Sequence, residues 1–110
     1  MLILSTKLKN AIIRKATKKN LSLNIQLKNI SINGVKRGCS GFVFIDNGPC
    51  VYVDTESSCY QPLIDKTLVR YARDNHDYSS NQIKNGYNQF VPSDPAIVAQ
   101  KIVNMMEAKN

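Results

Sequence analysis

An Asn-Gly pair at residues 33–34 lies between two strand-like stretches, and it limits the possible folds more than any other feature. Asn and Gly accept the positive φ angles that a two-residue type I′ hairpin turn requires. The segment "LSLNIQLK" at residues 21–28 alternates apolar and polar residues, as a half-buried strand does. Its phase slips at Lys28-Asn29, which predicts a β-bulge. The sequence therefore predicts a bulged hairpin that turns at residues 33–34.

Two further stretches, "GFVFI" at residues 41–45 and "CVYVD" at residues 50–54, are apolar at successive positions. Strands that are buried on both faces have this composition, and the intervening "DNGP" is a turn sequence. The two stretches predict a central hairpin. Chain order then gives an antiparallel meander of three or four strands.

A first helix is predicted at residues 7–19. Ser5 and Thr6 are candidate N-caps, and Asn20 can adopt the left-handed conformation that ends a helix. At about 100° per residue, one side of this helix is apolar. That side consists of Leu8, Ile12, Ile13 and Ala16.

Two more helices are predicted nearer the C-terminus, one at residues 62–75 with Pro62 in its first turn, and one that begins at Pro95 after an Asp94 cap. Their core-facing residues are Ile64, Leu68, Tyr71 and Ala72 in the former, and Val98, Ile102, Met105 and Met106 in the latter. The expected fold is α+β, a single domain over residues 1–110 in the order α-β-β-β-β-α-α. Its antiparallel three- to four-stranded meander carries helices packed on one face.

Charge is distributed unevenly along the chain, whose net charge is +7. Residues 1–45 contain nine Lys and Arg side chains and no Asp or Glu, whereas residues 46–110 contain six basic and eight acidic side chains. Such an asymmetry between the two parts of a chain indicates nucleic acid or another anionic surface as a partner.

The first predicted helix concentrates this charge. Surface helices usually mix both signs and gain i, i+4 ion pairs, so a purely solvated face is the alternative interpretation. Here Arg14 and Lys18 repel each other at that spacing, at a cost of about 0.2–0.5 kcal/mol per pair. A phosphate backbone would reverse the sign of that energy. The helix therefore favours a polyanion without specifying which one.

The expected function is that of a small basic nucleic-acid-binding accessory protein, which contacts mainly the phosphate backbone of DNA or RNA, duplex or single-stranded, with weak sequence specificity. The predicted contact residues are Lys7, Arg14, Lys15, Lys18, Lys19, Lys36, Arg37, Lys66, Arg70 and Arg73.

The stretch "KRGCSGFVFI" at residues 36–45 resembles the signature of the RNA-recognition-motif family, in which a basic residue and a glycine precede alternating aromatics on a strand. The resemblance implies that Phe42 and Phe44 would stack on bases. It departs from the family at Cys39-Ser40 and in the order of elements after Ile45, and it covers ten residues. The alternative is that both aromatics belong to the core under the helices, with Gly38 and Gly41 marking a bend or bulge.

The segment at residues 76–92 is long, polar and rich in Asn, with Tyr78, Tyr87 and Phe90 as possible stacking or partner contacts. It supports a second hypothesis, a protein-binding module or inhibitor whose basic surface meets an acidic groove, such as the channel of a nucleic-acid-processing enzyme. The size and composition are typical of proteins carried by phages and mobile elements.

Catalysis, metal binding and a cofactor are not expected. A Cys59–His76 pair lacks an oxyanion loop or any orienting motif, and a single histidine with no C-x-x-C pair does not make a zinc site. An odd number of cysteines at these spacings is no disulfide framework. No apolar run is long enough for a membrane span or signal peptide, so we expect a cytoplasmic protein with no membrane partner.

Overall fold

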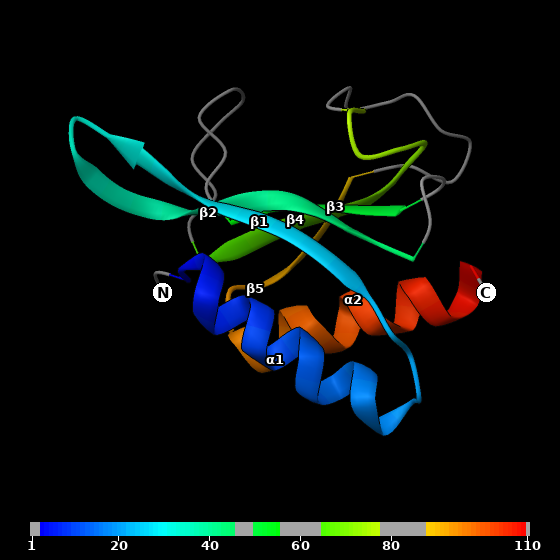
Figure 1. Ribbon diagram of the computed structural model, residues 1–110. Helices are drawn as coiled ribbons and strands as arrows, with labels where there is room; N and C mark the ends of the chain where they lie inside the picture. The colour runs from blue at the N-terminus through cyan, green and yellow to red at the C-terminus, as the bar shows by residue number, and fades with distance from the viewer. Residues whose placement is uncertain (1–2, 46–49, 56–64, 78–87, 110) are drawn as a thin grey trace.

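The computed structural model describes residues 3–45, 50–55, 65–77 and 88–109. In chain order these form α1 (Ser5–Lys18), β1 (Asn24–Ile32), β2 (Val35–Phe44), β3 (Cys50–Asp54), β4 (Lys66–Ala72), β5 (Gln89–Pro92) and α2 (Pro95–Lys109). The strands build one antiparallel sheet in the order β1-β2-β3-β4-β5, and both helices lie on the same face of it (Figure 1). The predicted α+β meander with helices on one face is confirmed, with five strands instead of three or four.

The main core lies between the sheet and the two helices. Its apolar side chains come from both layers, as predicted for most helical positions. The buried residues include Leu8, Ile12, Ala16, Val43, Val51, Val53, Val69, Val98, Ile102, Met105 and Met106. Ile13 is the exception, because 45% of it is exposed. The buried stripe is centred between Ala11 and Ala16, and at about 100° per residue Ile13 falls beyond its edge.

The ends of the helices are held by specific polar contacts. Asp94 Oδ1 accepts hydrogen bonds from the amides of Ala96 (2.9 Å) and Ile97 (3.3 Å), which confirms this cap. Asn20 has a φ of 57°, which confirms the left-handed end of α1. The predicted Ser5 or Thr6 cap is wrong, because both lie inside the helix. The acceptor for the Ser5 amide is Asn29 Oδ1 of β1, at 2.8 Å.

The predicted helix at residues 62–75 is wrong where the structure describes it, because Lys66–Ala72 is the strand β4. Its four consecutive residues Thr67–Arg70 are buried, since β4 pairs with β3 on one edge and β5 on the other, and its two faces contact different layers. When a strand is apolar on both faces, its apolar residues can also match the i, i+3, i+4 spacing that predicts a helix. Pro62 and Ile64 lie outside the described residues, and the predicted loop at 76–92 contains β5.

The predicted hairpin is confirmed. Asn33 and Gly34 have φ angles of 53° and 79°, and Ile32 pairs directly with Val35 across the turn. The register shifts between Ile30 and Ser31, two residues beyond the predicted bulge. Because Ile30 pairs with Gly38 and Ser31 with Lys36, Arg37 is the extra residue of the bulge.

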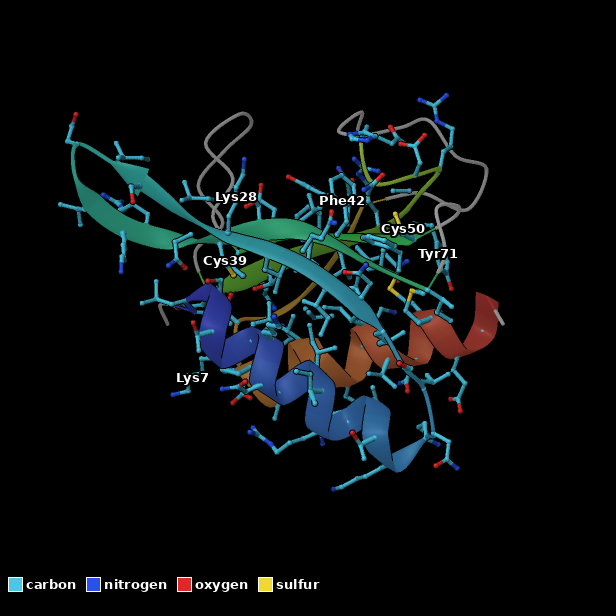
Figure 2. All side chains as sticks on the ribbon, in the orientation of Figure 1. Lys7, Lys28, Cys39, Phe42, Cys50 and Tyr71 are labelled. Atoms are coloured by element: carbon cyan, nitrogen blue, oxygen red, sulfur yellow. The ribbon has the colours of Figure 1, made fainter. Side chains whose placement is uncertain are left out.

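A second apolar cluster lies on the face of the sheet opposite the helices. Phe42 and Phe44 are buried there with Cys50 and Ala72, and Tyr52 packs against them. Figure 2 shows Phe42 on that face and Cys39 on the helix face of the same strand. The expectation that the two phenylalanines point under the helices is therefore wrong, although they are buried. Gly41 precedes them because a Cβ at this position would meet the backbone carbonyl of Gln26 in β1.

Candidate functional site

The basic side chains of residues 1–45 lie at the surface. Eight of the nine are exposed, and Lys15 is half-buried because it falls on the apolar side of α1. In the described part of the chain, the one ion pair that any of them makes with an acid joins Lys19 Nζ to Glu107 Oε2 at 3.8 Å. These cations are therefore mostly exposed and, as far as the described residues go, largely not neutralised by acids of the protein.

On α1 the positive charge is only partly explained by helix stability. Lys15 and Lys18 lie in the last turn, where they interact favourably with the negative end of the helix dipole. The first turn contains no acid, and Lys7 lies near the positive end of the dipole. Its position is mildly unfavourable, by about 0.3–1 kcal/mol at low salt. A partner with negative charge would remove that cost.

The β1–β2 hairpin extends beyond the rest of the sheet. β3 pairs with β2 only from Ser40 to Val43, so among the described strands β1 is the one partner of residues 35–39. We call residues 30–38 the arm. All residues from Ser31 to Arg37 are exposed, including Lys36 and Arg37, and Figure 1 shows the arm projecting past the other strands.

The base of the arm is held by hydrogen bonds from two sides. Here Asn29 of β1 pairs with Cys39 of β2. Thr55 Oγ1 accepts a hydrogen bond from the Cys39 amide at 2.9 Å, and the Thr55 amide donates to the Cys39 carbonyl at 3.0 Å. From the other side, the Ser5 amide of α1 donates to Asn29 Oδ1. The arm therefore leaves the body from a base that both β3's end and α1 hold in place.

The structure divides the predicted cations into separate groups. The Ser5–Asn29 contact brings the N-terminal end of α1, with Lys7, next to the base of the arm. Arg14 and Lys18 lie further along α1; at about 1.5 Å per residue, Lys18 is roughly 16 Å from Lys7 along the helix axis. Lys28 lies on the sheet face opposite the helices (Figure 2). The expected basic surface is thus two groups, α1 and the arm, which meet near residue 29.

The Lys66, Arg70 and Arg73 group does not form the predicted helical face. Only 2% of Arg70 is exposed. Its Nη2 donates to the Asp77 carbonyl at 2.8 Å, and its guanidinium lies 4.7 Å from the centre of the Tyr52 ring. Arg73 Nε pairs with Asp77 Oδ2 at 3.3 Å. Arg70 is therefore a structural residue, and of the three only Lys66 is exposed without an ion pair to a described acid.

Other sequence-predicted positions divide between exposed and undescribed ones. Phe90 on β5 is 51% exposed, while Tyr78, Tyr87 and Cys59 lie outside the described residues. His76 is exposed, and its amide donates to Asp74 Oδ1.

Burial raises the pKa of the Cys39 thiol to about 11 and that of the Cys50 thiol to about 12, so both are protonated at neutral pH.

Two further properties of the described residues concern metal binding and membrane insertion. Among them, no three His, Cys, Asp or Glu side chains are grouped closely enough to hold a metal ion. Neither described helix has the length and apolar character needed to cross a bilayer.

Sequence reasoning missed a groove between α1 and the outer edge of β1. A hollow of about 390 Å³ there is lined in part by Ile13, Leu21 and Leu23, and a neighbouring one of about 410 Å³ adds Lys9 and Ile45. Helical periodicity predicts Ile13 in the core, and only the width of the buried stripe places it on the groove wall. In the described sheet, β1 has a strand partner on one edge only.

Comparison of the chain with models of protein families, with curated proteins and with solved structures found no match. The short resemblance to the RNA-recognition motif thus gains no support. The buried Phe42 and Phe44 also cannot stack on bases in this structure.

Proposed function

We propose that this protein binds nucleic acid, mainly through the phosphate backbone, and that it acts by binding instead of catalysis. The observation that carries the proposal is the exposed and largely unneutralised set of cations on α1 and the arm. Each such side chain that meets a phosphate releases a condensed counterion, which favours association. A helix face that contacts only water would be more stable with charges of both signs, because opposite charges at i, i+4 attract each other.

The acidic side chains of the second part support this interpretation, because several already have partners away from the arm. Asp77 pairs with Arg73, Asp94 caps α2, and Glu107 reaches only Lys19. In the described residues, no acid lies within ion-pair distance of Arg14, Lys36 or Arg37. A polyanion would supply the negative charge that the described acids do not bring to these three side chains.

The test is a titration of labelled single- and double-stranded oligonucleotides at 50 and 200 mM salt. With about five phosphates contacted, affinity should fall roughly 500-fold between these conditions. Arg14→Glu/Lys18→Glu on α1 and Lys36→Glu/Arg37→Glu on the arm should each weaken binding at least about tenfold. Lys66→Glu/Lys101→Glu is the matched control, since it changes the total charge equally outside both groups. Equal effects of all three pairs, or no binding at 50 mM salt, would refute the proposal.

A second candidate function is supported by the groove beside β1. An extended segment of an acidic partner protein could add a strand to the free edge of β1 and place side chains against Ile13 and Leu23. This is the protein-binding or inhibitor hypothesis with a definite location. Replacing Ile13 with the neutral Asn should abolish such binding and leave oligonucleotide affinity nearly unchanged. If no protein partner depends on Ile13, this second function is refuted.

A further inference from the structure

We propose that the arm enters the major groove of duplex DNA and that Ile32 and Val35 at its tip contact thymine methyl groups. This inference rests on the proposed nucleic-acid binding and specifies the substrate as a B-form duplex. It starts from an unusual composition: the Asn33-Gly34 turn is flanked by two apolar residues that are exposed, Ile32 by 40% and Val35 by 58%, and no part of the described core covers either side chain.

The dimensions of the arm fit this groove. The major groove of B-DNA is about 12 Å wide and 8.5 Å deep, and it admits a two-stranded ribbon. From the base at Asn29 to Ile32 are three steps of β1, or about 10 Å at 3.4 Å per residue, since the extra residue Arg37 on β2 adds no step to the ladder. The arm is therefore long enough for its tip to reach the floor of the groove while the body stays outside.

The charges on the arm fit the walls of the groove. Lys36 and Arg37 follow the tip on β2, and both are exposed. Because Arg37 is the extra residue of the bulge, it interrupts the alternation of side chains just where the arm begins to project. Cations at this position can reach the flanking phosphates while the apolar tip faces base edges. Thymine is the base that presents an apolar group, its C5 methyl, in this groove.

Rigidity supports the same assignment. The hydrogen bonds of Cys39 with Thr55 and of Asn29 with Ser5 fix the direction in which the arm leaves the body. A preorganised element loses less conformational entropy on binding than a loose loop of the same sequence. The Lys7 end of α1 lies beside this base, so it can contact a neighbouring phosphate when the arm is inserted.

An alternative role for Ile32 and Val35 is purely structural. They face each other across the turn, and a cross-strand pair of β-branched residues stabilises a hairpin by about 0.2–1 kcal/mol. The decisive variant is therefore Ile32→Thr/Val35→Thr, because Thr keeps the β-branched shape and strand propensity but makes the tip polar. Its circular dichroism spectrum and melting temperature should match those of the wild type.

The experiment compares two duplexes of identical sequence, one containing thymine and the other uracil, which lacks the C5 methyl. Burying one methyl group changes affinity about fourfold. The wild-type chain should bind the thymine duplex roughly tenfold more tightly than the uracil duplex. The Ile32→Thr/Val35→Thr variant should lose most of this preference, because each Thr offers only one methyl group beside a polar hydroxyl. A Lys36→Glu variant should weaken both complexes and keep the preference for thymine.

The outcomes separate the two proposals. If the wild type binds no duplex and no single strand at 50 mM salt, the proposed function fails and this inference fails with it. If the wild type binds duplex but does not distinguish thymine from uracil, the proposed function stands and the insertion of the arm is refuted. A dimer that forms through the arm and disappears in the Ile32→Thr/Val35→Thr variant, without discrimination between the duplexes, would also overturn it.

Discussion

At the scale of single residues, the charge of a side chain does not show whether it can bind a ligand until its burial is known. Arg70 and Lys36 are both cations on strands, yet one is enclosed between Tyr52 and the Asp77 carbonyl and the other is exposed. A buried guanidinium needs hydrogen-bond acceptors and a flat apolar surface, and it has both here. Arg70 therefore contributes to the second cluster of the sheet and not to the basic surface.

Replacing Arg70 by Leu should lower the free energy of unfolding by about 3 kcal/mol, because it leaves buried acceptors without a donor. Urea denaturation followed by circular dichroism measures the change. The control is Lys66→Leu on the same strand, whose exposed side chain should cost less than about 0.5 kcal/mol. Similar midpoints for the two variants would contradict the structural role of Arg70.

Gly41 is constrained by its neighbour in β1 and not by a turn. A Cβ there would meet the Gln26 carbonyl, and the φ of this residue is 156°. Gly41→Ala should therefore destabilise the protein by about 3 kcal/mol or more, since β1 must move away from β2. Gly34→Ala is the matched control: its φ is 79° but nothing lies within 4 Å of the added Cβ, so it should cost only about 1–2 kcal/mol. The melting temperatures of both variants measure the two losses of stability. A larger loss in Gly34→Ala than in Gly41→Ala would rule out the close approach of β1 to Gly41.

At the scale of elements, the features that depend on neighbouring residues could be predicted and those that depend on distant ones could not. Asn33-Gly34 and Asp94-Pro95 determine a turn and a cap within a few residues, and both were found. β4 could not be distinguished from a helix, because its central place between β3 and β5 and the burial of its two faces depend on residues elsewhere in the chain. The exposure of Arg14 and Lys18 followed from helical periodicity. The length of the arm could not be predicted in this way, because it depends on where β3 begins to pair with β2.

The contact between α1 and β1 gives an element-scale prediction. Asn29→Ala removes the acceptor of the Ser5 amide and should lower stability by about 1 kcal/mol, as the loss of an N-cap does. Asn29→Asp keeps the acceptor and places a negative charge at the positive end of α1, so it should be as stable as the wild type or slightly more so. Urea unfolding midpoints measure both effects, with Asn24→Ala at an exposed position of β1 as the control. A loss of stability in Asn29→Asp equal to that in Asn29→Ala would show that the contact does not cap α1.

At the scale of the whole molecule, most of the exposed cations of residues 1–45 lie on two elements, α1 and the arm. The cation-rich first part forms α1 and the two strands of the arm, while described acids such as Asp77 and Asp94 have structural partners in the second part. The two basic groups meet only near residue 29. A ligand that contacts both must therefore be extended, which a duplex is and a compact anion is not.

The length of duplex needed for full affinity tests this geometry. The longest dimension of the molecule is 38 Å, which corresponds to about 11 base pairs at 3.4 Å each. Affinity should rise steeply as the duplex lengthens from about 6 to 11 base pairs and then level off, because both basic groups are by then engaged. Lys36→Glu/Arg37→Glu should remove most of this rise, since α1 alone covers a shorter stretch, whereas the Lys66→Glu/Lys101→Glu control should keep it. Fluorescence anisotropy over a series of duplex lengths at constant salt measures how affinity depends on length. An affinity that grows only in proportion to the number of binding positions on the duplex would show that the two basic groups do not act together.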